Sequence, residues 1–205
     1  MKDKILIILS IILIIISLSV GVYVRNSEEG ILFDMDIMKY IHGNMTLEIA
    51  KFMNIITFFG SSYFFIFIGI IIFIFLKRNN NCKGIILLIT STLGSYILNY
   101  ILKNIFVRTR PLEYFLIEQG GYSFPSGHSM VSISFYTTMT YLLTKSQSSK
   151  RINIILWIAN FIIVAFIGFS RVFLGVHWPT DVLVGFILGL VYSYATVKIV
   201  EKTNN

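Results

Sequence analysis

Six long apolar runs dominate this chain of 205 residues, and they constrain its fold more than any other feature. A hydrophobic stretch of roughly 17–25 residues is long enough to span a lipid bilayer as a helix. The fourth run is short and rich in Ser and Thr, so we expect it inside a bundle rather than against lipid. The sequence therefore predicts an all-α, six-span transmembrane bundle. The runs are Ile5–Val24, Ile55–Leu76, Ile85–Leu102, Ser129–Thr144, Ile152–Phe169 and Thr180–Val197.

The composition supports a membrane protein without a separate soluble domain. Charged residues make up 13% of the chain, whereas soluble domains carry about 25%. We predict that residues 1–205 form one integral membrane domain. The first run could instead be a signal peptide, because Lys2 and Lys4 precede its apolar core. That core is longer than the roughly 7–15 residues of a signal peptide, so we favour an uncleaved span.

The distribution of basic residues predicts which side of the membrane each loop occupies. With the N-terminus inside, the inside segments carry ten of the seventeen Lys and Arg residues and two of the ten acidic residues. Positive charge beside a span prefers the cytoplasm. We therefore expect a multi-pass protein of the cell membrane with both termini cytoplasmic. This topology accounts for the net charge of +7 without a nucleic-acid partner.

The segment Asp34–Asn54 lies between the first two runs and has an amphipathic pattern. Apolar residues such as Ile49, Phe52 and Ile56 recur at helical spacing, with Glu48 off that stripe. This pattern predicts a short amphipathic helix at the outer membrane surface. An ordinary packed loop helix fits the same pattern about equally well.

Three polar clusters lie at span ends, and the predicted topology places all three on the outer side. They are Lys103–Pro111, Ser123–Ser129 and Ser170–Asp181. A single Lys or Arg at a span end is often only a membrane anchor. Ionisable groups at membrane depth are costly, however, and usually mark a functional site. Because three clusters coincide on one side, the sequence indicates a site.

The cations of these clusters suit an oxyanion with several charged oxygens, phosphate above all. Lys103, Arg110 and Arg171 supply the positive charge. An arginine side chain contacts two phosphate oxygens at once, while lysine acts as a point charge. Ser126 and Gly127 could add a hydroxyl and an unobstructed backbone N–H at the start of a helix, which is itself a favourable anion site.

The histidines could perform the chemistry. His177 precedes Asp181 by four residues, and Pro179 suits the first turn of the last helix. The carboxylate could then hold one ring nitrogen and leave the other as a nucleophile. His128 would act as general acid on the leaving oxygen and as general base on water. This hypothesis divides the displacement at phosphorus into two steps through a phosphohistidine.

The order and spacing of these residues resemble the type 2 phosphatidic acid phosphatase superfamily of membrane lipid phosphatases. The resemblance implies that His177 is the nucleophile, Asp181 its orienting partner and His128 the acid and base. It also implies that phosphate is bound by Lys103, Arg110, Ser126, Gly127 and Arg171, without a metal or another cofactor. Three motifs carry the resemblance: Lys103 with Arg110-Pro111, Pro125-Ser126-Gly127-His128, and Ser170-Arg171 with His177 and Asp181.

The resemblance implies a lipid phosphate or pyrophosphate as the substrate, with membrane lipids as the surroundings and no obligatory protein partner. We favour undecaprenyl pyrophosphate, which is released on the outer face of the membrane where the site is expected. Phosphatidylglycerophosphate or phosphatidic acid is the alternative. A haloperoxidase would share the motifs but is a soluble protein. A non-enzymatic lipid carrier could keep the phosphate site but would not need both histidines.

Two further expectations concern residues outside the motifs. Arg108 is not a motif position, and we expect it to contact the membrane surface. Gly185 and Gly189 follow Asp181 at intervals of four residues. Small residues at this spacing let helices approach closely in lipid. We predict that this face packs against another span and holds Asp181 behind His177.

Overall fold

The computed structural model describes residues 2–25, 27 and 30–202, where every regular element is helical. Most of the long helices begin and end close to the bounds of the predicted apolar runs, because polar turns separate these runs in the sequence. The elements are α1 (Lys2–Val24), α2 (Leu32–Gly43), α3 (Leu47–Phe58), α4 (Ser62–Arg78), α5 (Cys82–Phe106), the 3-10 helix η1 (Leu112–Tyr114), α6 (Gly127–Lys145), α7 (Lys150–Phe173) and α8 (Pro179–Lys202).

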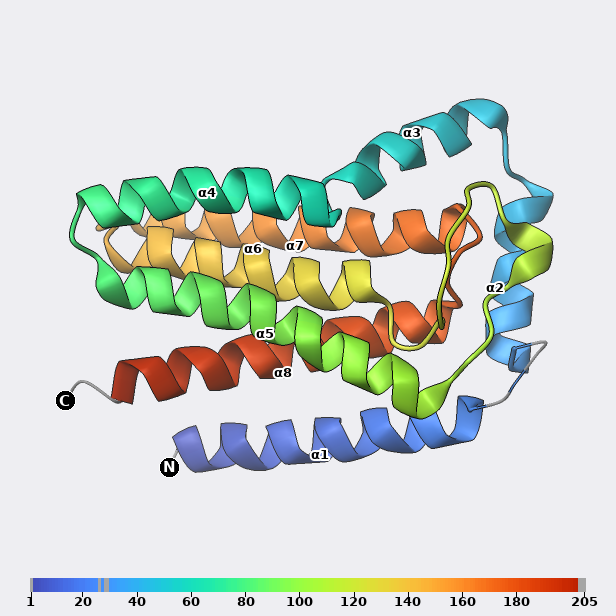
Figure 1. Ribbon diagram of the computed structural model, residues 1–205, viewed down its shortest axis with the longest axis horizontal. Helices are drawn as coiled ribbons and strands as arrows, with labels where there is room; N and C mark the ends of the chain where they lie inside the picture. The colour runs from blue at the N-terminus through green and yellow to red at the C-terminus, as the bar shows by residue number, and fades with distance from the viewer. Residues whose placement is uncertain (1, 26, 28–29, 203–205) are drawn as a thin grey trace.

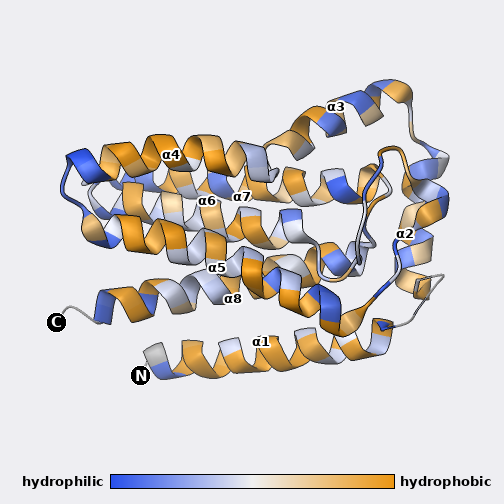
Figure 2. Cartoon of the chain, viewed as in Figure 1, coloured by the Kyte–Doolittle hydropathy of each residue, from blue (hydrophilic) through white to orange (hydrophobic). Residues whose placement is uncertain are grey.

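Helices α1 and α4 to α8 run alongside one another, and α6 lies at the centre, where it contacts α5, α7 and α8 (Figure 1). Apolar residues cover most of α1 and α4, and hydrophilic residues gather near the helix ends (Figure 2). Within the described residues, five stretches are long and apolar enough to cross a membrane. They are Lys4–Val24, Leu47–Arg78, Cys82–Phe106, Lys150–Phe173 and Pro179–Lys202. A sixth crossing by α6 stays a prediction.

Helix α6 is interior, as its Ser and Thr content predicts. Hydroxyl groups on it are buried and bonded to neighbouring helices. Thr138 donates to Ser91 Oγ over 2.7 Å. Ser134 Oγ lies 3.0 Å from Ser95 Oγ and 3.0 Å from the carbonyl oxygen of Gly189. Such bonds hold helices together where lipid offers no competing partner.

The predicted packing of the small-residue face of α8 is confirmed, and its partner is α6. A Cβ atom on Gly189 would come 2.4 Å from the carbonyl oxygen of Met130. A Cβ atom on Gly185 would come 2.8 Å from the carbonyl oxygen of Ser126. Because real Cβ atoms do not approach so closely, the two backbones touch only because both positions are glycine.

The segment 34–54 forms two helices rather than one. Between them, Thr46 Oγ1 accepts a hydrogen bond from the backbone N–H of Ile49 over 3.3 Å and caps α3. Helix α2 packs inward, where Met38 is fully buried in a cluster with Trp178. The amphipathic pattern is therefore interrupted, and its first half behaves as a packed loop helix. The place of α3 relative to the membrane surface stays a prediction.

The second predicted run, Ile55–Leu76, is also interrupted. The chain turns between α3 and α4, where Ser61 Oγ caps α4 by accepting from Phe64 N over 3.2 Å. The turn packs tightly, because a Cβ atom on Gly60 would come 3.0 Å from Cδ2 of His128. This turn therefore places backbone directly against a residue of the predicted site.

The two ends of the bundle hold different helix termini and loops. Helix α1 begins and α8 ends at one end, which also holds the turns between α4 and α5 and between α6 and α7 (Figure 1). The opposite end holds the ends of α5 and α7 and the starts of α6 and α8, with the connecting loops. All three polar clusters of the sequence lie at that opposite end.

Candidate active site

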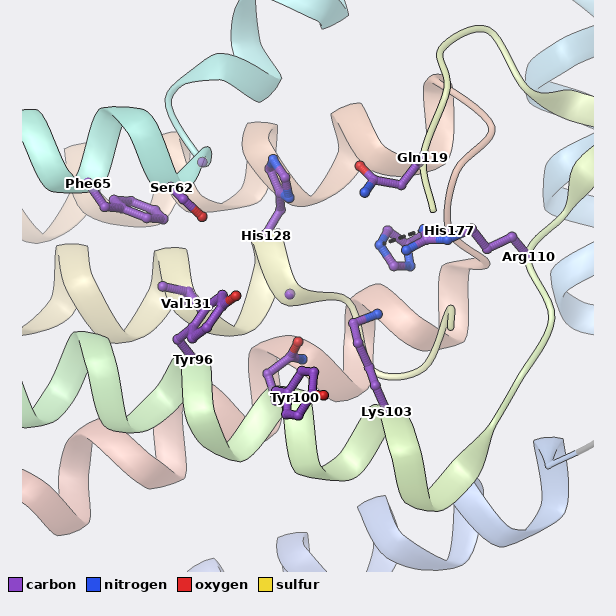
Figure 3. A pocket seen from close by; sticks show the side chains of 13 residues that line it. Ser62, Phe65, Tyr96, Tyr100, Lys103, Arg110, Gln119, His128, Val131 and His177 are labelled. Carbon is purple, nitrogen blue, oxygen red and sulfur yellow. Dashed lines mark hydrogen bonds between the residues drawn. The ribbon is translucent and has the colours of Figure 1, made fainter. Parts of the chain in front are cut away.

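A cavity of about 190 Å³ lies where the three polar clusters meet. His128 reaches it from the first turn of α6, His177 from the loop before α8, and Lys103 from the last turn of α5 (Figure 3). The structure therefore brings the predicted catalytic histidines and the first cation into one space. The lining residues are Gly60, Ser62, Phe65, Tyr96, Asn99, Tyr100, Lys103, Arg110, Gln119, Gly127, His128, Val131 and His177.

The start of α8 positions the pair formed by His177 and Asp181. Pro179 begins the helix, as predicted, and Oδ2 of Asp181 accepts from the backbone N–H of Trp178 over 2.9 Å. This bond turns the carboxylate back toward the preceding loop. Oδ2 consequently lies 3.3 Å from Nδ1 of His177, and Ser123 Oγ donates to the same oxygen.

The contacts of His177 define which ring nitrogen carries the proton. Nε2 lies 3.2 Å from Nη1 of Arg110. A guanidinium can only donate, so Nε2 accepts and carries no proton. The proton of the neutral ring then sits on Nδ1, facing Asp181. This is the tautomer that a nucleophilic Nε2 requires.

Burial and charge keep this ring neutral. His177 is 2% exposed. Burial first, and then the charges of Arg110 and Lys103, lower the pKa of His177 well below its usual value of 6.5. A lowered pKa keeps Nε2 unprotonated at neutral pH, because the charged form is disfavoured.

Arg110 is held by the loops around the cavity. Its guanidinium donates to the carbonyl oxygens of Gly120, Gly121 and Tyr122 over 3.0, 2.9 and 3.1 Å, and to that of Val176 over 2.5 Å. Burial lowers its pKa to about 10, so the side chain remains charged at neutral pH. These bonds fix a cation beside Nε2 of His177.

The other two cations are held in different ways. Lys103 donates to the carbonyl oxygens of Tyr122 and Ser123, the latter over 3.1 Å, and lines the cavity. Arg171 is 1% exposed and donates to Gln119 Oε1 over 2.8 Å and to Thr57 Oγ1 over 2.6 Å. Arg171 is therefore connected to the cavity by its bond to Gln119, which is one of the lining residues.

The start of α6 offers backbone N–H groups to the cavity, whereas the side chain of Ser126 bonds within the helix. Ser126 is fully buried, and its Oγ caps the helix by accepting from Ser129 N over 3.4 Å and from Ser129 Oγ over 3.0 Å. Its hydroxyl thus serves the helix rather than the cavity. Gly127 and His128 occupy the first turn of α6, where N–H groups have no intrahelical partner. A phosphate in the cavity would face these N–H groups.

The expectation that Arg108 contacts the membrane surface is wrong. Arg108 is fully buried between two carboxylates, with Nη1 2.6 Å from Oδ1 of Asp181 and Nη2 2.6 Å from Oδ2 of Asp34. Its guanidinium also lies over the ring of Trp178, 5.4 Å from the centroid. A charged guanidinium is unfavourable in lipid, whereas inside the protein it pairs with two buried carboxylates.

Several residues that bond to the site received no role from the sequence. Ser123 only opens the second polar cluster and Gln119 is an ordinary loop residue there, although both bond site residues in the structure. Asn99 lies in the middle of an apolar run, and its Nδ2 donates to the carbonyl oxygen of Pro125 over 3.1 Å. The position of this polar amide inside a predicted span was its one indication in the sequence, since such groups usually have a partner within the bundle.

The arrangement can carry out displacement at a phosphorus atom. It combines an unprotonated ring nitrogen, a second histidine across the cavity, two lining cations and free helix N–H groups. Within the described part of the chain, no three His, Cys, Asp or Glu side chains come together as a metal site would need. The positive charge around the cavity is supplied by side chains.

The chain is similar in sequence to a known family and to named proteins. Residues 84–205 match the family model described as the PAP2 superfamily, and all the motif residues fall within them. The chain is 29% identical to a protein named undecaprenyl-diphosphatase from Sulfolobus acidocaldarius, over 92% of this chain and 89% of that one. It is 41% identical to phosphatidylglycerophosphatase B of Bacillus subtilis, over 52% of this chain and 53% of that one.

A solved structure extends the similarity to nearly the whole chain. The crystal structure of a transmembrane PAP2-type phosphatidylglycerolphosphate phosphatase from Bacillus subtilis superposes with a TM-score of 0.87 at 28% sequence identity. The superposition covers 96% of this chain and 98% of that one. The likeness therefore includes α1 to α4, which lie outside the matched family region.

Proposed function

The chain belongs to the PAP2 superfamily and is a phosphatase of that family, and on that premise we propose that it removes the terminal phosphate from a lipid phosphate or pyrophosphate through a phosphohistidine. The observation that carries this proposal is the pair of contacts at His177. Nδ1 faces Asp181 at 3.3 Å, and Nε2 faces the cavity and Arg110 at 3.2 Å.

In the first step, Nη1 of Arg110 turns from Nε2 of His177 to a phosphoryl oxygen, and the lone pair that this frees on Nε2 forms a bond to phosphorus. The bond between phosphorus and the leaving oxygen breaks, and His128 gives that oxygen its proton. The ring of His177 becomes positive while its Nδ1 proton stays directed at Asp181. Lys103, Arg110 and the N–H groups of α6 stabilise the charge on the phosphoryl oxygens.

In the second step, His128 takes a proton from water as the water oxygen attacks phosphorus. The nitrogen–phosphorus bond breaks, its electrons return to Nε2, and inorganic phosphate leaves. The neutral His177 and the protonated His128 are thereby restored. One cavity performs both steps because the same phosphoryl group stays bound throughout.

An apolar groove next to the cavity supports a lipid substrate. The groove has a volume of about 520 Å³ and lies between α4 and α5, with Phe135 of α6 in its lining. A lipid chain in the groove would keep its phosphate in the cavity without leaving an apolar environment. Four residues line both spaces: Ser62, Phe65, Tyr96 and Val131.

Among lipid substrates we favour undecaprenyl pyrophosphate. The relative from Sulfolobus acidocaldarius is named for that activity and matches over 92% of this chain. The predicted outward site would also meet the lipid where it is released. Phosphatidylglycerophosphate is the second candidate, because the Bacillus subtilis structure with a TM-score of 0.87 is that of a phosphatidylglycerolphosphate phosphatase. Phosphatidic acid shares the same headgroup chemistry.

Purified protein tests the proposal directly. Phosphate release is measured with undecaprenyl pyrophosphate, phosphatidylglycerophosphate and phosphatidic acid side by side, at equal lipid concentration in the same detergent. We expect the highest kcat/KM with the pyrophosphate. A higher value with phosphatidylglycerophosphate would reverse the order of the two substrates. Binding without phosphate release from any of the three would support a lipid carrier instead.

A further inference from the structure

Arg108 joins the catalytic carboxylate to a residue far away in the sequence. Its Nη1 donates to Asp181, and its Nη2 donates to Asp34 near the start of α2. All three side chains are fully buried. Buried charges persist only when they are paired and hydrogen-bonded. The site therefore continues behind Asp181 into a segment that precedes the matched family region of residues 84–205.

Asp34 also holds the start of α8, the helix that carries Asp181. Its Oδ1 accepts from the backbone N–H of Thr180 over 2.9 Å. Its Oδ2 accepts from Thr180 Oγ1 over 2.8 Å, and the same hydroxyl accepts from Arg108 over 2.7 Å. Free N–H groups in a first helical turn are usually capped by a nearby residue. Here a carboxylate from α2 performs that task.

The charges of this cluster suit the proposed reaction. Two carboxylates and one guanidinium leave one net negative charge next to His177. When Nε2 bonds to phosphorus, the ring gains a positive charge while Nδ1 keeps its proton. The cluster then offsets the charge that forms. Without the Asp34 carboxylate, the charge of Arg108 would balance the charge of Asp181. The cluster beside the charged ring would then be neutral.

We infer that Asp34 is a positioning residue of the active site, which acts chiefly through Arg108 to orient and balance Asp181. The inference rests on the proposed phosphohistidine mechanism. Asp34 touches neither the cavity nor the reacting atoms. Its loss should therefore slow the chemical step and leave substrate binding nearly unchanged.

The first test replaces Asp34 with asparagine. Asp34→Asn keeps the side-chain size but turns one acceptor oxygen into an NH₂ group, which cannot accept from Arg108 or Thr180. We expect kcat to fall on the order of tenfold or more, the size of loss known for outer partners of metal-binding histidines, with KM within about threefold. Asp36→Asn is the matched control, because Asp36 lies exposed on the same helix. Equal kcat in both variants would overturn the inference.

A second comparison keeps the test valid where Asp34→Asn alone does not fold. Arg108→Gln is compared with the paired variant that carries Asp34→Asn as well, since the pair removes the cation together with its anion. If Asp34 acts through Arg108, the pair has the same kcat as Arg108→Gln. A further tenfold loss in the pair would contradict a shared pathway.

His177→Ala is measured in the same series to separate the two proposals. An inactive His177→Ala with a fully active Asp34→Asn would refute the role of Asp34 and leave the nucleophile in place. An active His177→Ala would instead refute the mechanism itself.

Discussion

Nε2 of His177 lies 3.2 Å from Nη1 of Arg110, so the free nitrogen of the ring faces a cation rather than a carboxylate. Arg110 also lines the cavity beside that nitrogen. A phosphate bound by this guanidinium would lie beside the nitrogen that attacks it. In the proposed mechanism, binding and positioning for attack would therefore be one event.

The nucleophile is tested by His177→Ala. We expect turnover to fall by about six orders of magnitude, as in other enzymes that lose the central residue of a catalytic unit. Phosphate release is measured on purified protein, and a thermal melt confirms that the variant folds. Residual activity within tenfold of the parent would exclude His177 as the nucleophile.

The pH profile tests the electrostatics of His177. Burial and the charges of Arg110 and Lys103 lower its pKa below 6.5. The reactive neutral form then persists as pH falls, so the acidic limb of kcat/KM assigned to His177 should lie below pH 6.5. Arg110→Gln removes a cation that lowers this pKa, so the limb should move to higher pH. Both proteins are measured with the same substrate, so that ionisation of the substrate affects both profiles equally. If the acidic limb does not move in Arg110→Gln, the limb belongs to a group other than His177.

The sequence predicts the motif residues of this site better than the contacts behind them. His177 and Asp181 lie four residues apart around the start of a helix, so local geometry alone brings them together. Lys103, Gly127 and His128 lie at span ends, and counting spans places those ends on one side. These positions follow from short-range spacing and topology, which a sequence states directly.

The network behind Asp181 could not be predicted in this way. Arg108 and Asp34 are 74 residues apart, and each alone resembles a polar residue at a membrane surface. Their pairing depends on how α2 folds back over α8, which no local pattern encodes. The division of segment 34–54 into two helices has the same origin, because the inward packing of α2 overrides the amphipathic stripe.

The contact between α6 and α8 is tested by Gly189→Ala. The added Cβ would lie 2.4 Å from the carbonyl oxygen of Met130, so the helices would have to separate. We expect a loss of about 1–3 kcal/mol in unfolding free energy. Gly69→Ala is the control, because a Cβ atom there meets nothing within 4 Å. Similar melting curves for the two variants would show that α6 and α8 tolerate a wider spacing.

Metal removal tests the source of the positive charge at the cavity. Lys103 and Arg110 line it, so we expect phosphate release to continue in excess EDTA. Activity with and without EDTA is compared after the protein has been dialysed against the chelator. A complete loss that Mg²⁺ restores would require a metal in the mechanism.

The last prediction concerns the side of the membrane on which the cavity opens. Seven Lys and Arg residues fall on the predicted outer side, against ten on the inner side. Four of the seven have bonds within the proposed site, and these would account for their position: Lys103, Arg108, Arg110 and Arg171. The remaining three make the positive-inside preference clear. We therefore expect the cavity to open outward, with both termini cytoplasmic.

Cysteine labelling in intact cells checks this orientation. Glu118 lies exposed in the loop beside the cavity, and Cys82 lies exposed at the start of α5, at the opposite end of the bundle. We expect Glu118→Cys to react with a membrane-impermeant maleimide and Cys82 to react only after the cells are opened. Labelling of Cys82 in intact cells would invert the topology. The case for undecaprenyl pyrophosphate would then weaken, because the cavity would face the side of the membrane where that lipid is not released.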